Sequence, residues 1–181
     1  MKINNVAVIG AGLMGSGIAA QVANAGFPVT LLDIVPDGAT NRNVIAEGAV
    51  SKMLKPVKLG SPTPLMHRRN AKLITTGNIE DNLDLIKDAD LIIEVVLERL
   101  DVKHDVFRKI EKFRKKGSII TSNTSTIPRE QLVEGMAESF AKDFMITHFF
   151  NPPRYLRLLE IVSGSEVSQE KVKIISDFCD I

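Results

Sequence analysis

The fold is decided near the start of the chain, by the stretch Val6-Ala7-Val8-Ile9-Gly10-Ala11-Gly12-Leu13-Met14-Gly15-Ser16-Gly17. An apolar run leads directly into glycines, and a helical run of small residues follows at 18–25. Gly10 permits a tight turn, Gly12 lets a ligand approach the backbone, and Gly15 lets helix and strand pack closely. This order of strand, glycine turn and helix is typical of a dinucleotide site, where a diphosphate meets free N–H groups at a helix N-terminus.

The segment after this helix predicts which dinucleotide binds. Gly26 ends the helix, and a second strand at 29–33 ends in Asp33. Asp33 comes 18 positions after Gly15, where a carboxylate accepts hydrogen bonds from an adenosine ribose and repels a 2′-phosphate. The pattern favours NAD over NADP, and its predicted contacts are Asp33 with Gly10, Ala11, Gly12, Leu13, Met14 and Gly15. The alternative is a glycine turn that joins strand to helix without a ligand.

The composition is that of an ordinary globular domain. The chain has 181 residues, of which 44% are hydrophobic and 25% charged, enough for one domain with a substantial core. Its 23 basic and 22 acidic residues create no global field that would recruit nucleic acid or an anionic membrane. The single Cys179 excludes an internal disulfide and fits a reducing compartment, although it would equally fit a secreted chain without disulfides. No apolar run approaches the roughly 18 residues of a membrane span and no cleavable signal is visible, so we expect a cytoplasmic chain, although a chain trimmed of a transit peptide would look the same.

Short β-rich runs alternate with helical patterns along the chain. This alternation predicts an α/β fold, a Rossmann-type doubly wound, mostly parallel sheet with flanking helices. The expected strands are 6–9, 29–33, 73–76, 91–96, 118–123, 144–149 and 158–162. Helices are expected at 101–116 and 166–181, the first with a packed stripe of Val102, Val106, Phe107, Ile110 and Phe113.

Two polar side chains interrupt the last two apolar strands. His148 lies in the run 145–150, and Glu160 lies in 158–162, where burial of an unpaired carboxylate would be costly. If these strands pair, Glu160 accepts a hydrogen bond from one imidazole nitrogen and leaves the other free as a proton acceptor. The alternative is a buried histidine that the backbone satisfies, with Glu160 bonded to an unrelated donor.

A polar cluster, residues 121–126, follows the strand expected at 118–123. Open parallel sheets bind ligands at this end of their strands, so a hydroxyl of the cluster is placed to orient a substrate oxygen. The alternative is that these hydroxyls cap the helix that begins near Pro128. No metal site and no nucleophilic serine are predicted, because the chain has neither zinc-ligand spacing nor a GxSxG motif.

The segment 52–72 is basic although the whole chain is nearly neutral. It contains no acidic residue and six basic ones, Lys52, Lys55, Lys58, Arg68, Arg69 and Lys72. These side chains would suit a phosphorylated substrate, and the alternative is a solvated helix face. Within it the stretch 56–70, with Pro56, Gly60, Pro62 and Pro64, predicts a long loop or an insertion between helices.

Three motifs together resemble the NAD-binding domain of the L-3-hydroxyacyl-CoA dehydrogenase family: the glycine turn 10–15, Ser122-Asn123-Thr124-Ser125, and His148-Phe149-Phe150-Asn151-Pro152-Pro153. The resemblance spans essentially the full chain, and residues 151–156 are similar to the branch found in long bacterial fatty-acid oxidation proteins. It implies that His148 is the catalytic base, Glu160 its partner, and Ser125 the hydroxyl that binds the substrate oxygen. It also implies cofactor contacts at Glu98, Lys103, Ser125 and Asn151. For Glu98 and Lys103 the sequence by itself indicates an exposed helix or loop, and for Glu94 no specific role is implied.

The resemblance implies a reaction, the NAD-dependent oxidation of (S)-3-hydroxyacyl-CoA to 3-ketoacyl-CoA in fatty-acid β-oxidation. The acyl-CoA partner would be held by the basic segment 52–72. Residues 1–181 would form one NAD-binding domain that is impaired alone, because the helical domain that follows in this family, with its substrate contact and its oligomer contacts, is expected to be absent. Alternatives are a dehydrogenase of a free hydroxy or sugar acid and a non-catalytic NAD-binding module, but mere binding does not need Ser125, His148 and Glu160 together.

Overall fold

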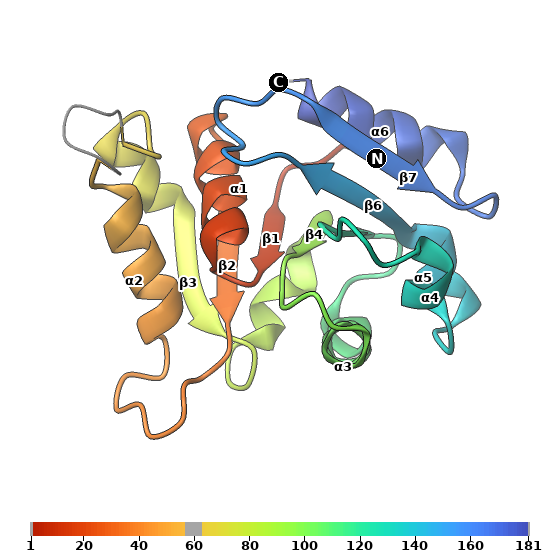
Figure 1. Ribbon diagram of the computed structural model, residues 1–181, viewed down its shortest axis with the longest axis horizontal. Helices are drawn as coiled ribbons and strands as arrows, with labels where there is room; N and C mark the ends of the chain where they lie inside the picture. The colour runs from red at the N-terminus through yellow and green to blue at the C-terminus, as the bar shows by residue number, and fades with distance from the viewer. Residues whose placement is uncertain (1, 57–62, 181) are drawn as a thin grey trace.

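The structure is a computed structural model that describes residues 2–56 and 63–180. Within these residues seven strands form one sheet in the order β3-β2-β1-β4-β5-β6-β7 (Figure 1). The strands are β1 (Val6–Ile9), β2 (Val29–Asp33), β3 (Ile74–Asn78), β4 (Leu91–Glu94), β5 (Ile119–Ser122), β6 (Phe144–Phe149) and β7 (Leu159–Ser163). Neighbours are parallel except for the antiparallel pair β6–β7. The predicted Rossmann-type, mostly parallel sheet is confirmed.

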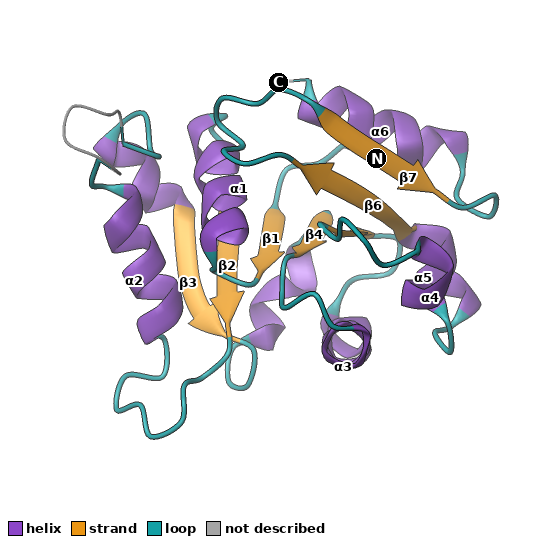
Figure 2. Cartoon of the chain, in the orientation of Figure 1, coloured by secondary structure: helices purple, strands orange, loops and turns teal. Residues whose placement is uncertain are grey.

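Helices cover both faces of this sheet (Figure 2). They are α1 (Leu13–Asn24), α2 (Val44–Met53), α3 (Leu100–Phe113), α4 (Arg129–Val133), α5 (Glu138–Asp143), α6 (Gln169–Cys179) and the 3₁₀ helices η1 (Arg68–Leu73) and η2 (Leu83–Asp88). One core packs α1, α2 and α6 against the sheet, and a second packs η2, α3, α4 and α5 against the opposite face. In β1 the alternation of side chains sends Val8 to the first core and Ile9 to the second. None of these helices, over the described residues, combines the length and apolarity that crossing a bilayer requires.

The expected strands and the helices expected at 101–116 and 166–181 are all present, and their ends differ from the expected ones by at most three residues. For example, β4 ends at Glu94 and not at Val96, because the Val96 N–H donates to the Glu94 carboxylate (2.7 Å) and not to a neighbouring strand. In the loop expected at 56–70, residues 68–70 instead belong to η1, whose first turn is capped by the His67 imidazole. Lys58, Gly60 and Pro62 of that expected loop lie outside the described residues.

The expected packed stripe of α3 is wrong at both ends. The buried residues of this helix are Lys103, Val106, Phe107 and Ile110, whereas Val102 is only partly buried and Phe113 is 43% exposed. The buried set has the spacing i, i+3, i+4, i+7, which is the spacing of one helix face. A lysine therefore belongs to the face that packs on the sheet.

The carboxyl ends of β1, β4, β5 and β6 lie along one edge of the sheet, because these strands are parallel neighbours. The order reverses between β1 and β4, so this edge contains the point at which doubly wound sheets bind their ligands. The loops that follow these strands carry the glycine turn, Glu98, Ser125 and Asn151. The sheet therefore brings together residues that are far apart in the sequence.

Candidate active site

The turn after β1 has no room for side chains at two of its three glycines. Gly10 has a φ of +108°, and a Cβ atom there would lie 2.8 Å from the carbonyl carbon of Val95 and closer still to its oxygen. A Cβ atom on Gly15 would likewise overlap the carbonyl group of Gly10. At Gly12, in contrast, a Cβ atom would have no neighbour within 4 Å. Packing among the described residues therefore does not require glycine at position 12, and the open space fits a ligand that approaches the backbone.

The N-terminus of α1 presents unpaired backbone groups at this turn. The N–H groups of residues 13–15 donate to no acceptor within the described residues. Asp33 lies beside them, because its Oδ2 accepts from the Ala11 N–H (2.5 Å) and its Oδ1 accepts from the Ile34 N–H (2.7 Å). Each of these oxygens keeps a lone pair for a further donor. The free N–H groups and the held carboxylate fit the diphosphate and the ribose of a dinucleotide.

Most side chains of the polar cluster 121–126 hold this edge of the sheet together. Thr121 accepts from the Thr147 hydroxyl (2.8 Å), Ser122 donates to Glu94 (2.6 Å), Asn123 accepts from the Phe149 N–H (2.9 Å), and Thr124 and Thr126 donate to Glu98. No side chain caps α4, so the alternative that these hydroxyls cap that helix is wrong. Ser125 is exposed, and within the described residues its hydroxyl alone in the cluster has no hydrogen-bond partner. It is therefore the hydroxyl of this cluster that is free to bind a ligand.

Strand pairing brings His148 and Glu160 together. The antiparallel register of β6 and β7 sets the two residues opposite each other, with Nδ1 and Oε2 2.8 Å apart. The alternative in which the backbone satisfies the imidazole is therefore not what the structure has. The Phe150 ring packs 4.6 Å from the imidazole, centroid to centroid, which limits the orientations open to His148.

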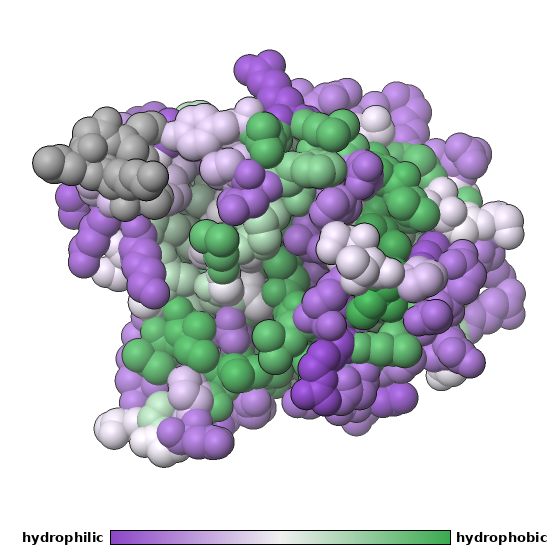
Figure 3. Space-filling view, viewed as in Figure 1, coloured by the Kyte–Doolittle hydropathy of each residue, from purple (hydrophilic) through white to green (hydrophobic). Residues whose placement is uncertain are grey.

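The expected burial of Glu160 is wrong, because its side chain is 55% exposed, against 22% for His148. β7 is an edge strand, and α6 packs on only one of its faces. The other face presents Glu160 and the half-exposed Val162, and apolar surface gathers there in the space-filling view (Figure 3). Glu160 is thus a water-accessible partner of a partly buried imidazole.

A cavity of about 300 Å³ lies between β6, β7 and the loop after β5. Ser125, His148 and Glu160 line it together, with apolar walls that include Ile146 and Val162. The loop after β6 also reaches α1, since the Pro153 ring lies 3.2 Å from where a Cβ atom on Gly17 would be. The loop that follows His148 therefore packs near Gly17 of α1, the helix that begins at the glycine turn.

A buried ion pair lies under this edge. Lys103 is 1% exposed, and its Nζ lies 2.8 and 3.0 Å from the two carboxylate oxygens of the fully buried Glu94 and 3.3 Å from Glu98. Burial raises the pKa of the Glu94 carboxyl, against the opposing effect of the Lys103 charge. At Glu98 partial burial is outweighed by the Thr124 hydroxyl and the Lys103 ammonium, which lower the pKa to about 2.

The residues implied as cofactor contacts differ in accessibility. The Glu98 side chain is 38% exposed, Asn151 is exposed in the loop after β6, and Lys103 is buried. The sequence-based interpretation of Lys103 as an exposed residue is therefore wrong, whereas its role as a cofactor contact stays a prediction. The structural roles of Glu94 and Asn123 were missed: Lys103 and Ser122 lie 9 and 28 residues from Glu94, and Phe149 lies 26 residues from Asn123.

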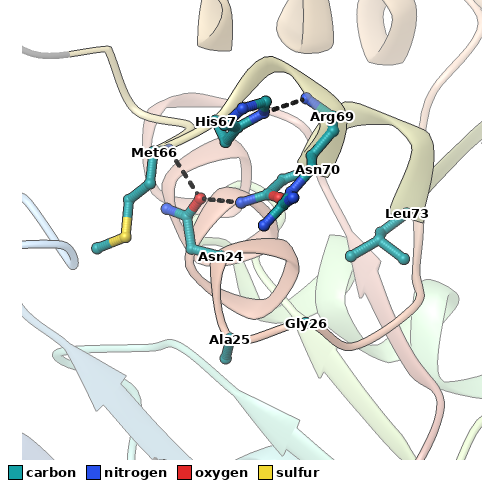
Figure 4. Close-up of a pocket in the computed structure, with 8 residues that line it drawn as sticks. All are labelled: Asn24, Ala25, Gly26, Met66, His67, Arg69, Asn70 and Leu73. Atoms are coloured by element: carbon teal, nitrogen blue, oxygen red, sulfur yellow. Dashed lines mark hydrogen bonds between the residues drawn. The ribbon is translucent and has the colours of Figure 1, made fainter.

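The basic residues of segment 52–72 that the structure describes are all exposed, and Lys58 lies outside the described residues. A cavity of about 540 Å³ lies at the C-terminal end of α1, lined by Asn24, His67, Arg69 and Asn70 among others (Figure 4). Figure 4 shows the Asn24 amide at its centre, where it accepts from the Met66 N–H and from the Asn70 side chain. This cavity is about 18 Å from the glycine turn along α1, given the 1.5 Å rise per residue of an α-helix.

The chain is similar to known proteins over almost its whole length. Residues 5–180 match the family model described as 3-hydroxyacyl-CoA dehydrogenase, NAD binding domain. A probable 3-hydroxyacyl-CoA dehydrogenase of Deinococcus radiodurans is 47% identical over 99% of this chain and 51% of its own length. A putative fatty acid oxidation complex trifunctional enzyme of Rickettsia felis is 44% identical over 98% of this chain and 24% of its own length. The chain thus spans about half the length of the first relative and about a quarter of the second.

Solved structures show the same relationship. The crystal structure of 3-hydroxybutyryl-CoA dehydrogenase from Escherichia coli K12 has a TM-score of 0.78 and 30% identity, and the match covers 99% of this chain and 36% of that one. The glycine turn, the parallel sheet and the family match agree on the cofactor, which is NAD. This chain belongs to the family of 3-hydroxyacyl-CoA dehydrogenases, as an NAD-binding domain.

Proposed function

We propose that this chain is the cofactor-binding and His/Glu-bearing part of an enzyme that oxidises (S)-3-hydroxyacyl-CoA to 3-ketoacyl-CoA in fatty-acid β-oxidation. One observation carries the proposal: the bonded pair His148 and Glu160 shares a cavity with the unpartnered hydroxyl of Ser125. A site that only bound a dinucleotide would need none of these three in combination.

The mechanism assigns one task to each of the three residues. The Nδ1–H of His148 donates to Glu160, which leaves Nε2 as the acceptor of the proton from the 3-hydroxyl group. Glu160 stabilises the imidazolium that forms, and the Ser125 hydroxyl donates to the substrate oxygen. When bound, NAD supplies the acceptor for the C3 hydride. The protein therefore contributes proton transfer and positioning.

The coenzyme A part of the substrate is assigned to the basic segment 52–72. Its support is the cavity lined by His67, Arg69 and Asn70, next to exposed Arg68 and Lys72. A hydrogen bond from the Arg154 guanidinium to the Thr63 carbonyl joins this segment to the loop after β6, and so toward His148.

The proposal extends to the longer protein. A helical domain outside residues 1–181 is proposed to complete the substrate site and to make the oligomer contacts, which fits a chain that spans 51% of the Deinococcus relative. The 181-residue chain would then bind NAD but turn over substrate weakly. A cytoplasmic location is also proposed, and the single cysteine of the chain is its support.

The test measures NAD reduction by the longer protein with 3-hydroxybutyryl-CoA and with free hydroxy acids. We expect turnover of the thioester and little of the free acids. His148→Gln should lower turnover roughly 10²–10⁴-fold, the usual loss for a missing acid–base group, with NADH affinity unchanged. Activity of this variant within about tenfold of the wild type, or equal turnover of a free hydroxy acid, would contradict the proposal.

A further inference from the structure

Glu94 is a buried charged residue that the mechanism above does not use. It is the last residue of β4, and the strand register pairs it with Ile9 of β1 on one side and Ser122 of β5 on the other. Its exposure is 0%. Glu94 therefore lies under the edge of the sheet, between the glycine turn and the strand that leads to Ser125.

Every hydrogen bond of the Glu94 carboxylate is one that it accepts. Lys103 donates to both oxygens, the Ser122 hydroxyl donates to Oε2 (2.6 Å), and the Val96 N–H donates to Oε1 (2.7 Å). An ionised carboxylate accepts from all of these donors, whereas a glutamine amide of the same shape would turn its NH₂ group toward one of them. The position is therefore built for a negative charge.

The Lys103 ammonium connects the buried Glu94 carboxylate to the surface of the site. It also contacts Glu98 (3.3 Å), whose Oε1 accepts from the N–H groups of Ser125 (3.2 Å) and Thr126 (3.3 Å). The connection thus runs from β4 through α3 to the loop that carries Ser125. Glu98 is its first member that solvent reaches, and Glu94 itself is too deeply buried to touch a ligand.

We propose that Glu94 is a positioning residue of the nicotinamide half of the cofactor site. Its carboxylate fixes Lys103, and Lys103 in turn holds Glu98 and the Ser125 loop. A doubly wound sheet binds a dinucleotide with one half on each side of the switch point, and Asp33 at the end of β2 marks the adenosine half. The loops after β4 and β5 therefore face the nicotinamide and its ribose, a placement that rests on the proposed function.

The experiment compares two ligands on the full 181-residue chain with the substitution Glu94→Gln. NADH occupies both halves of the site, whereas ADP lacks the nicotinamide and its ribose. We expect the dissociation constant of NADH to rise about tenfold, as for a lost charge-assisted contact, with that of ADP within about twofold. Equal weakening of both ligands, or unchanged NADH binding in a variant that unfolds at the wild-type temperature, would overturn the inference.

A second variant guards against misfolding caused by the uncompensated Lys103 charge. The double substitution Glu94→Gln with Lys103→Met removes both buried charges, a change that proteins often tolerate. The double variant should lose as much NADH affinity, relative to ADP affinity, as Lys103→Met alone, because Glu94 acts through Lys103. A further loss of NADH binding in the double variant would overturn the inference. Since no turnover is measured, this outcome is distinguishable from a failure of the proposed acyl-CoA oxidation.

Discussion

The two halves of the site are held by different kinds of contact. The nucleotide half, residues 9–15 with Asp33, is formed by backbone groups that pack without side chains at Gly10 and Gly15. The other half, around His148 and Ser125, is proposed to be catalytic and is called the catalytic half; it is held by side-chain hydrogen bonds between residues 12 to 27 positions apart in the sequence. Substitutions in the first half should therefore act through steric overlap, and those in the second through lost hydrogen bonds.

The largest effect is expected from Gly15→Ala, compared with the matched substitution Gly12→Ala. The new Cβ at position 15 overlaps the Gly10 carbonyl, so the free energy of unfolding should fall by about 3 kcal/mol. At position 12 the new Cβ would have no neighbour within 4 Å, so the free energy of unfolding should change by less than about 0.5 kcal/mol. NADH affinity of the Gly12 variant should still fall, because the side chain enters the space of the diphosphate. Denaturant unfolding measures the stability of the two variants, and NADH titration measures their affinity. If Gly12→Ala bound NADH as tightly as the wild type, the diphosphate would not approach the backbone at Gly12.

The next effect concerns the one side chain of the nucleotide half. Asp33→Asn keeps the shape but removes the charge, so NADH affinity should fall about tenfold, or 1.4 kcal/mol, while NADPH affinity rises as repulsion of its 2′-phosphate is lost. Exposed Asp37, a few residues on, is the control position for a substitution by asparagine. Titration with NADH and NADPH gives the ratio of the two affinities. An unchanged ratio in Asp33→Asn would show that Asp33 serves only to hold the glycine turn.

The sequence reveals these two halves unequally. The nucleotide half lies in one local stretch with a recognisable spacing, and its strand ends were predicted to the residue at β1 and β2. The pairing of His148 with Glu160 could be predicted because each is a polar residue in an apolar run. The exposure of Glu160 could not, because an edge strand has the same apolar run as a central one and only the sheet order leaves it uncovered.

The sequence does contain a signal for the buried ion pair of Lys103 and Glu94. Lys103, Val106, Phe107 and Ile110 follow the spacing of one helix face, so the lysine shares the face of three apolar side chains. A lysine in an apolar neighbourhood requires an anion, and the apolar run 91–96 contains one carboxylate, Glu94. The Phe149 N–H bonded to Asn123, and the hydroxyl and N–H groups of residues 124–126 bonded to Glu98, are in contrast 26 to 28 residues away and have no local signal.

A smaller effect is expected in the catalytic half from Asn123→Ala, which leaves the Phe149 N–H without its acceptor at the end of β6. The loss should cost about 1 kcal/mol of unfolding free energy. ADP affinity should stay unchanged, because the nucleotide half does not depend on this contact. Asn123→Asp keeps an oxygen in the same place and is the control that should retain most of the stability. A parallel loss of ADP binding in the alanine variant would mean that the two halves are not held separately.

The last effect is the part of the pH dependence of stability that Glu98 contributes in the catalytic half. The pKa of Glu98 falls from its ordinary 4.5 to about 2 in the folded chain, so its stabilising effect is full above about pH 4.5 and is lost as the pH falls toward 2. Glu98→Gln should remove the pH dependence that Glu98 contributes, and the unfolding free energy should then change less steeply between pH 4.5 and pH 2. Exposed Glu134, substituted by glutamine, is the control and should leave the slope unchanged. Acid unfolding followed by circular dichroism measures both slopes. A slope in Glu98→Gln as steep as that of the wild type would mean that the Ser125 loop is not held by an ionised Glu98, and that its hydrogen bonds are no stronger than those of a neutral amide.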